Sequence, residues 1–104
     1  MAGLVLEILT EKQLSKIKIE IVPGIPAALS CAALLGAPLM HDFAVISLSD
    51  LLTDKELIKK RVELAAKGDF VLVFYNPKSK KRIAPLKDAL RILLKYKSYE
   101  TPVG

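Results

Sequence analysis

Two short loops hold the residues whose types and spacing best suit ligand chemistry. The first is Val22–Ala28, VPGIPAA, which lies between an expected strand and an expected helix. Its Gly24 would let a ligand approach the backbone closely, and the helix start offers free N–H groups. The second is Tyr75–Pro77, YNP, at the end of another expected strand. In open α/β sheets ligands bind beyond the carboxyl ends of strands, although an ordinary turn also explains either loop.

Four basic residues follow the second loop: Lys78, Lys80, Lys81 and Arg82. The chain around them has a formal net charge of +5 and a pI of about 9.4. Such a cluster is either a solvated surface or a binding site for an anionic ligand. Nucleic acid is disfavoured as a partner, because no aromatic side chains interleave with the lysines and no nucleic-acid motif is present.

Several kinds of catalytic site are excluded by composition. With one cysteine and one histidine, the chain lacks the Cys/His cluster of a zinc site. It contains no G-x-G-x-x-G, no Walker loop and no G-x-S-x-G elbow. The adjacent His41 and Asp42 would diverge on a strand, and a polar or capping role in a loop explains His41. We therefore expect no catalytic side chain and no metal ligand.

The apolar content is high for a chain of this size. Its 104 residues are 52% hydrophobic, which indicates surface intended for a partner or a further domain. The longest uncharged stretch, Ile21–Met40, contains five prolines and glycines, whereas a membrane span needs ~20 residues of continuous helix. No basic region precedes an apolar run at the N-terminus, and Cys31 has no second cysteine to pair with. We expect no membrane association and a reducing, cytoplasmic location.

The hydrophobic periodicity predicts an α/β fold with alternating strands and helices and a mostly parallel sheet. The expected strands are Ile17–Val22, Phe43–Leu48 and Phe70–Tyr75, and Tyr99–Val103 could begin another. The expected helices are Ala2–Leu14, Ile25–Leu35, Thr53–Lys67 and Pro85–Lys97. Thr53 and Glu56 form a predicted capping box, and the uniformly apolar helix Ile25–Leu35 is expected to be buried on most sides.

Three stretches together resemble one enzyme family. They are VPGIPAA at Val22–Ala28, LLGAPLMHDFAVISLSD at Leu34–Asp50 and DFVLVFYNPKSKKR at Asp69–Arg82. They are similar to motifs of the tetrapyrrole (corrin/porphyrin) methylases, and within them of the C17-methyltransferases acting on precorrin-3B or cobalt-factor III. TPVG at Thr101–Gly104 resembles the start of the next family strand. The resemblance covers essentially the whole chain, so the expected fold is a partial tetrapyrrole methylase fold.

The resemblance implies an activity and a set of site residues. Family members are S-adenosylmethionine-dependent C-methyltransferases of cobalamin biosynthesis, with two α/β domains, a cleft between them and usually a homodimeric assembly. The C17 branch methylates a tetrapyrrole carbon with contraction of the ring. By position, Pro26 and Ala27 match the loop beside the methionine moiety of the cosubstrate, Tyr75 and Asn76 match the loop near its adenosine, and Gly104 matches a backbone contact. The tetrapyrrole substrate that the resemblance implies carries several carboxylates, which a basic cleft would attract, so the candidates for substrate binding are Lys78, Lys80, Lys81 and Arg82.

The chain also departs from the family pattern. The family's G-D-P-G-[VI]-Y-G loop and its final strands have no counterpart here, and Pro26 replaces a Ser or Thr. We expect a central fragment, in which about 1–38 end the N-terminal domain and about 42–104 begin the C-terminal domain. Such a fragment should be inactive alone. The alternative is a non-catalytic tetrapyrrole-binding or assembly module, and Ala2–Leu14 or Ile25–Leu35 is the expected homodimer contact.

Overall fold

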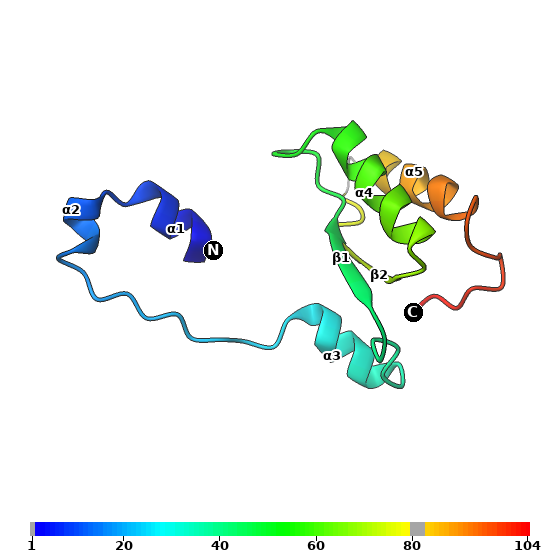
Figure 1. Ribbon diagram of the computed structural model, residues 1–104, viewed down its shortest axis with the longest axis horizontal. Helices are drawn as coiled ribbons and strands as arrows, with labels where there is room; N and C mark the ends of the chain where they lie inside the picture. Colours follow the sequence, from blue (N-terminus) through cyan, green and yellow to red (C-terminus); the bar gives the residue numbers. More distant parts are fainter. Residues whose placement is uncertain (1, 80–82) are drawn as a thin grey trace.

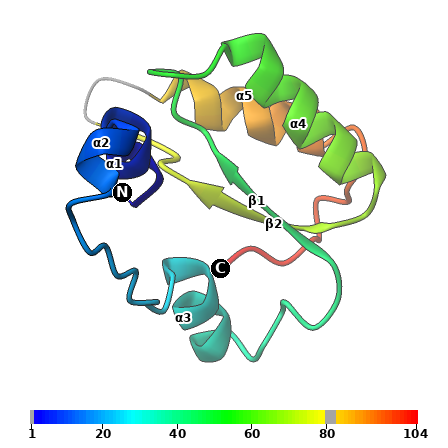
Figure 2. The same cartoon turned by 60° about the vertical axis from the view of Figure 1, so that its left-hand side comes forward.

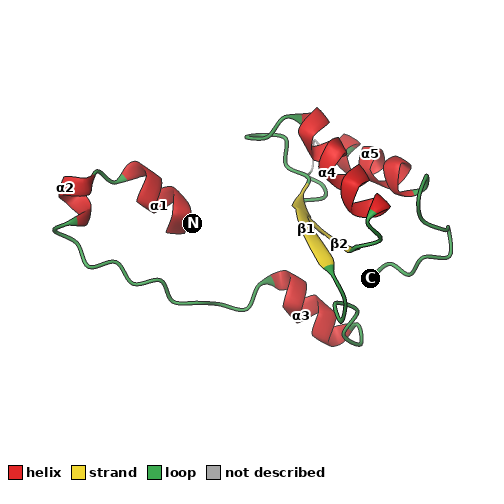
Figure 3. Ribbon diagram, viewed as in Figure 1, coloured by secondary structure: helices red, strands yellow, loops and turns green. Residues whose placement is uncertain are grey.

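A computed structural model describes residues 2–79 and 83–104 of the chain (Figure 1). Its elements are α1 (Ala2–Ile8), α2 (Glu11–Leu14), α3 (Ala27–Leu34), β1 (Phe43–Ser47), α4 (Lys55–Lys67), β2 (Val71–Tyr75) and α5 (Ala84–Leu93). Figure 3 shows strands and helices alternating from β1 onward, whereas helices and extended segments make up the chain before β1. The predicted α/β class is confirmed.

The sheet consists of β1 and β2, which pair in parallel. The register runs from Phe43 opposite Val71 to Ser47 opposite Tyr75. One further bond continues the ladder beyond β1, because Leu48 N donates to Tyr75 O at 2.9 Å. Parallel strands cannot be joined by a tight hairpin, so the chain must cross over between them, and α4 makes that crossing.

The crossover helix α4 begins and ends at residues suited to those positions. Its N-cap is Asp54, whose carboxylate accepts a hydrogen bond from Glu56 N at 3.3 Å. The predicted Thr53–Glu56 capping box is therefore wrong by one position, since the neighbouring aspartate offers the same kind of acceptor. At the other end, Gly68 caps the helix and Asp69 takes a left-handed backbone with φ 58° before β2 begins.

The core lies between α4, α5 and one face of the sheet. Ile58 and Val62 lie one turn apart on α4, which places both on the same face of the helix. They pack with three other buried residues, Ile46, Leu48 and Ala89. Leu48 and Val62 are 0% exposed, so they are the best-buried large side chains in the described part of the chain.

The segment after α5 is held to α4 by polar side chains. The Tyr96 hydroxyl donates to Glu63 Oε1 at 2.6 Å, and Lys67 Nζ lies 3.4 Å from the same carboxylate oxygen. Lys67 Nζ also lies 5.6 Å from the centre of the Tyr96 ring, within range of a cation–π contact. A second link joins Lys97 to Asp69. The predicted helix Pro85–Lys97 ends earlier, at Leu93, and continues as turns.

Helix α3 lies across the sheet from α4 and α5 (Figure 2). It buries Ala28 and Ala32, which lie one turn apart. The prediction that this helix is buried on most sides is wrong, because Leu29 is 48% and Leu34 88% exposed. The apolar composition of α3 favours burial, but the described residues pack against only one face of the helix, the face that contains Ala28 and Ala32.

The N-terminal residues depart most from the sequence expectations. The single helix predicted over Ala2–Leu14 is divided into α1 and α2, because Thr10 N donates to Gln13 Oε1 at 2.9 Å and begins a second helix. The strand predicted over Ile17–Val22 is wrong as well. Ile17 N donates to Leu14 O at 3.4 Å in a bend, and residues 18–22 then run extended without a backbone hydrogen bond to any described residue (Figure 1). The possible strand Tyr99–Val103 is not formed either.

Within residues 2–79 and 83–104, no helix is long and apolar enough to cross a membrane.

Truncating a fully buried side chain tests the core. We expect Leu48→Ala to lower the free energy of unfolding by about 2–5 kcal/mol, through lost burial and a residual cavity. Urea unfolding followed by circular dichroism measures the change. Leu52→Ala is the matched control, because Leu52 is 100% exposed and its truncation should stay within about 0.5 kcal/mol. Equal midpoints for the two variants would contradict this placement of the core.

The Glu63–Tyr96 contact predicts a pH dependence of stability at both ends of the pH scale. The hydrogen bond from Tyr96, followed by the Lys67 ammonium, lowers the pKa of Glu63. The stabilisation of the folded state that results is fully present above the pKa of Glu63 in the unfolded chain. It is lost as the pH falls through the lower pKa of Glu63 in the folded chain. The same hydrogen bond raises the pKa of Tyr96. The stabilisation from this second shift is fully present below the pKa of Tyr96 in the unfolded chain. It is lost as the pH rises through the higher pKa of Tyr96 in the folded chain.

Removing the phenol hydroxyl tests this contact directly. Tyr96→Phe should raise the pKa of Glu63 toward its ordinary value, with part of the depression remaining because Lys67 stays in place. Carboxyl carbon NMR titration measures the shift. Tyr99→Phe is the control, since Tyr99 is 87% exposed. An unchanged Glu63 titration in Tyr96→Phe would contradict the hydrogen bond.

Candidate functional site

One hydrogen bond joins the two loops that the sequence singled out. Ala28 N, in the first turn of α3, donates to the Tyr75 hydroxyl at 2.9 Å, across 47 residues of sequence. The contact is partly buried, and Ala28 itself is 7% exposed. The hydroxyl accepts this bond, so its own proton remains available for a further acceptor. The structure therefore brings Pro26–Ala28 next to the carboxyl end of β2.

The alternation of side chains along β2 explains why Tyr75 reaches α3. Phe74 packs against the core under α4 and α5, and successive strand residues point to opposite faces. Tyr75 consequently points to the other face, where α3 lies (Figure 2). Among the described residues, this hydrogen bond is the polar link between α3 and the sheet. The tyrosine thus sets the position of the first turn of α3.

The first turn of α3 presents donors at its free end. Pro26 is the N-cap with an extended backbone, φ −72° and ψ 153°, and as a proline it has no N–H of its own. Ala28 N is taken by Tyr75, and Leu29 N donates to Pro26 O at 3.0 Å. Ala27 N is the first helical donor and makes no hydrogen bond to any described residue. It is the group at this end best suited to an acceptor on a ligand.

Asn76 is held in an unusual backbone conformation beside this turn. Its φ is 52°, a left-handed value that asparagine tolerates better than most residues. The Asn76 side-chain amide Nδ2 donates to Ser47 Oγ at 3.1 Å. Ser47 ends β1 directly opposite Tyr75, so the ends of both strands contribute to one polar edge. Sequence reasoning missed Ser47, although its place at a strand's carboxyl end was a usable signal.

The other residues predicted for the site lie elsewhere or are not described. Gly104 lies against Leu35, just beyond α3, where a Cβ on the glycine would come within 2.5 Å of Leu35 Cδ1. It is therefore at the opposite end of α3 from Pro26 and Ala27. Lys78 is exposed, close in sequence to Asn76. Lys80, Lys81 and Arg82 lie outside the described residues.

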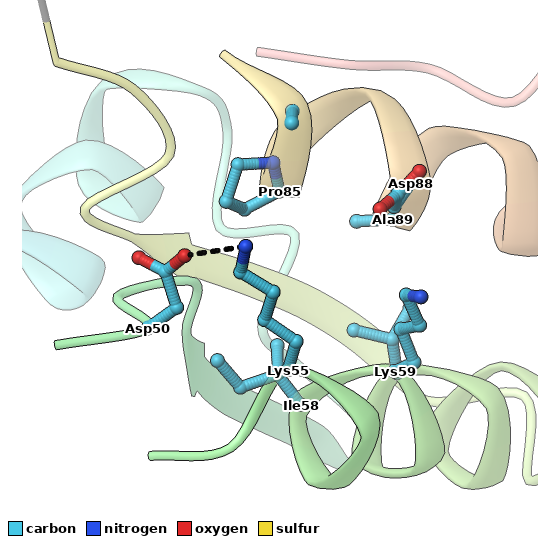
Figure 4. A pocket seen from close by; sticks show the side chains of 9 residues that line it. Asp50, Lys55, Ile58, Lys59, Pro85, Asp88 and Ala89 are labelled. Atoms are coloured by element: carbon cyan, nitrogen blue, oxygen red, sulfur yellow. Dashed lines mark ion pairs between the residues drawn. The ribbon is translucent and has the colours of Figure 1, made fainter. Parts of the chain in front are cut away.

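Neither of two cavities formed by described residues contains a residue predicted for the site. The first holds about 50 Å³ between α4 and α5, and Figure 4 shows Lys55 extending toward Asp50, with 3.5 Å between Nζ and Oδ2. It is lined by Asp50, Lys55, Ile58, Lys59, Val62, Ala84, Pro85, Asp88 and Ala89. This volume suits water, since small-molecule sites occupy roughly 300–1,000 Å³.

The second cavity is a shallow depression beside α3. Its volume is about 370 Å³, and it is lined by Leu29, Ala32, Ala33, Ala37, Leu39 and Met40. It is large enough for a small molecule, but its lining side chains are all apolar. A specific site also needs a few placed polar groups to orient its ligand. The polar edge formed by Ala27, Ser47, Tyr75 and Asn76 remains the better candidate.

The chemistry available at this edge is binding and orientation. It offers a backbone N–H, a phenol and a side-chain amide, which suit a polar ligand with acceptor groups. Among the described residues, no group of three or more His, Cys, Asp or Glu could hold a metal ion. Reactions that need no protein nucleophile fit such a site, because holding two reactants in alignment is itself catalytic.

Comparison with known proteins identifies relatives over the whole chain. The family model for Tetrapyrrole (Corrin/Porphyrin) Methylases matches residues 1–104. A cobalt-factor III methyltransferase from Priestia megaterium is 59% identical over 107 aligned residues, covering 100% of this chain and 20% of the relative. A probable cobalt-factor III C(17)-methyltransferase from Salmonella typhimurium is 50% identical, covering 100% of this chain and 43% of the relative.

A solved structure shares the fold. The crystal structure of the methyltransferase CobJ aligns with a TM-score of 0.77 at 44% identity, over 85% of this chain and 37% of that chain. A precorrin-3B C(17)-methyltransferase from a Sinorhizobium species is 45% identical over 87 residues, 84% of this chain and 34% of the relative. The chain thus spans less than half the length of each of these four proteins.

Tyr75→Phe tests the link between the two loops. Losing the hydroxyl leaves Ala28 N without its partner, which should destabilise the docked α3 by about 1–3 kcal/mol. Amide hydrogen exchange measured by NMR should show faster exchange through α3, while β1 and α4 keep their protection. Tyr99→Phe, at an exposed tyrosine, provides the matched control. Unchanged exchange in α3 would show that Tyr75 does not hold this helix.

Proposed function

We propose a function from the premise that this chain belongs to the tetrapyrrole methylase family, in the branch of the cobalt-factor III and precorrin-3B C17-methyltransferases. In this proposal it supplies part of the S-adenosylmethionine site of an enzyme of cobalamin biosynthesis. The enzyme methylates C17 of precorrin-3B or cobalt-factor III with ring contraction.

The observation that supports this proposal most strongly is the hydrogen bond between Ala28 N and the Tyr75 hydroxyl. Family resemblance assigns both loops to the same cosubstrate, and a shared site requires the two loops to be neighbours. Ala28 and Tyr75 are 47 positions apart in the sequence, yet the Ala28 nitrogen lies 2.9 Å from the Tyr75 hydroxyl oxygen. Asn76 and Ser47 extend the same edge. The residues we propose for the cosubstrate are Pro26, Ala27, Tyr75 and Asn76, with Gly104 as a further backbone contact.

The donors at this edge fit the cosubstrate chemically. S-adenosylmethionine carries a carboxylate, ribose hydroxyls and adenine nitrogens, and its bound sulfonium supplies the methyl group to an electron-rich ring carbon. Ala27 N is available to a carboxylate or other acceptor, and the proximity of the helix N-terminus favours negative charge. The Tyr75 proton and the second amide hydrogen of Asn76 are further donors. Alignment of the reactants can contribute ~7–11 kcal/mol to such a displacement, so no catalytic nucleophile is required.

The basic residues suit the proposed tetrapyrrole substrate. Its peripheral carboxylates would be attracted by Lys78, Lys80, Lys81 and Arg82, which follow the Tyr75–Asn76 loop directly. We assign these four residues to substrate binding by charge and by position in the sequence.

We also propose that these 104 residues form an incomplete site. Each of the four aligned proteins is more than twice as long as this chain. At the polar edge Ala27, Ser47 and Asn76 are exposed, so the described residues cover it on one side only. The family's two-domain architecture would place about 1–38 and about 42–104 in different domains, assembled as a homodimer. The second candidate function is a non-catalytic tetrapyrrole-binding or assembly module, which the exposed apolar depression beside α3 favours.

Titration calorimetry tests completeness. We expect weak or undetectable binding of S-adenosylmethionine and of its demethylated product to this chain, and no methylation. Losing even one or two well-made hydrogen bonds lowers affinity roughly tenfold to a hundredfold. Micromolar affinity for either ligand would show that the 104 residues form a complete site.

A chimera tests the function itself. Replacing the matching 43% of the Salmonella typhimurium relative with these 104 residues should retain methylation of cobalt-factor III, measured by mass spectrometry. Asn76→Ala in the chimera should reduce turnover about tenfold or more, because a ligand-facing amide is lost. Lys87→Ala, at an exposed residue on α5, is the control. A chimera that folds and binds the tetrapyrrole without methylating it would favour the non-catalytic module.

A further inference from the structure

The hydroxyl of Ser47, the last residue of β1, accepts two hydrogen bonds. One comes from the side-chain amide of Asn76, whose Nδ2 lies at 3.1 Å, and it crosses 29 residues of sequence. The other comes from Ser49 N at 3.3 Å and closes a local turn. A hydroxyl oxygen has two lone pairs, so these two donors fill its capacity as an acceptor. The local turn does not require the long-range bond, which therefore needs its own explanation.

The sheet fixes the position of Ser47. This residue is paired with Tyr75 in the parallel register, and directly after it Leu48 N donates to Tyr75 O at 2.9 Å. The preceding residue, Ile46, is buried in the core, so the Ser47 side chain points to the opposite face of the sheet. That is the face on which Tyr75 contacts α3. The Ser47 hydroxyl is thus an anchor on a hydrogen-bonded strand, on the same face as the candidate site.

Asn76 lies just beyond the ladder and needs such an anchor. Its backbone has a left-handed φ of 52°, and the residue is exposed. Among the described residues, its side-chain amide hydrogen-bonds to Ser47 alone. An unanchored asparagine side chain samples several rotamers, and a ligand that binds it must then order it at a cost in affinity. The bond to Ser47 removes that freedom before any ligand arrives.

We infer that Ser47 is a positioning residue for the cosubstrate, which holds the Asn76 amide in the orientation that the bound ligand requires. This inference rests on the proposed S-adenosylmethionine site. With Nδ2 turned toward Ser47, the amide oxygen Oδ1 makes no hydrogen bond to a described residue and is available to a donor. The nucleoside has such donors in its ribose hydroxyls and its adenine amino group. Ser47 acts through Asn76, by preorganisation, without touching the ligand.

Two substitutions of equal shape isolate the hydroxyl. Ser47→Thr keeps an oxygen at the γ position, whereas Ser47→Val puts a methyl group there, and both side chains suit a strand. In the Salmonella typhimurium chimera, Ser47→Val should lower kcat/KM for S-adenosylmethionine about three- to tenfold, the cost of ordering one side chain on binding. Ser47→Thr should restore the parent value. The KM for the tetrapyrrole should stay within about twofold in both variants.

Ser98 provides a matched control for the local turn. Its Oγ accepts from Glu100 N at 3.1 Å, the same kind of bond that Ser47 makes with Ser49 N. Ser98→Val therefore removes a turn-closing hydroxyl at an exposed residue without affecting the Asn76 amide, and it should leave kcat/KM unchanged. Equal losses in Ser98→Val and Ser47→Val would assign the effect of Ser47 to its turn and overturn the inference.

A double-mutant cycle tests whether Ser47 acts through Asn76. In the Asn76→Ala background, Ser47→Val should cause no further loss of kcat/KM, because the amide that it positions is already absent. Losses that multiply in the double variant would show that the two residues act independently, and Ser47 would then have no positioning role.

Side-chain NMR relaxation on the 104-residue chain measures the positioning without the reaction. Ser47→Val should lower the order parameter of the Asn76 side-chain amide, and Ser47→Thr should restore it. An unchanged order parameter in Ser47→Val would overturn the inference, whether or not the chimera methylates. Loss of order with unchanged kcat/KM would restrict Ser47 to the structure of the loop and overturn its role toward the cosubstrate. A parent chimera that neither binds nor uses S-adenosylmethionine would overturn the proposed function and this inference with it.

Discussion

The parallel pairing of β1 with β2 is the constraint on which the folded half of this chain depends. A parallel pair needs a crossing connection, and that connection is α4. Once α4 crosses one face of the sheet, its apolar side buries that face together with α5. The carboxyl ends of both strands then lie at one edge. This is why Ser47, Tyr75 and Asn76 meet there, although they come from separate segments.

Tyr75 connects that folded half to the first loop. Its backbone belongs to β2, whereas its hydroxyl accepts from Ala28 N on the face opposite the core. Small residues let α3 come close enough for this bond, since Ala28 and Ala32 form its buried side. The resulting site combines a helix N-terminus from one segment with strand ends from another. Such a combination places donors at fixed angles without requiring any charged side chain, which suits binding more than proton transfer.

How far the sequence predicted this structure depends on where each element finds its partner. Three predicted elements are close to the observed bounds: Phe43–Leu48, Phe70–Tyr75 and Thr53–Lys67. Each has an apolar pattern that matches its conformation, and each packs against other residues of this chain. The alternation of apolar and charged residues in Ile17–Val22 is equally clear, but no described strand pairs with this segment. The alternation therefore predicted an extended backbone correctly, whereas it could not predict pairing in a sheet. The strand-end rule singled out both loops, but the first loop follows no strand in the described chain, so the rule does not account for their proximity. The Tyr75–Ala28 bond could not be predicted, because it depends on where α3 docks.

The two halves of the chain differ in how strongly they are held, and the candidate site lies at their junction. Between β1 and α5 the chain has a closed core, whereas no residue in 3–25 is buried. Segments with few buried contacts open locally at little cost in free energy. Such a segment directly precedes Pro26 and Ala27. Their position therefore depends on α3 and on the hydrogen bond between Ala28 N and the Tyr75 hydroxyl. A ligand that bridged Ala27 N and the β2 end would stabilise both the bond and the helix, because binding to the docked state alone shifts the equilibrium toward it.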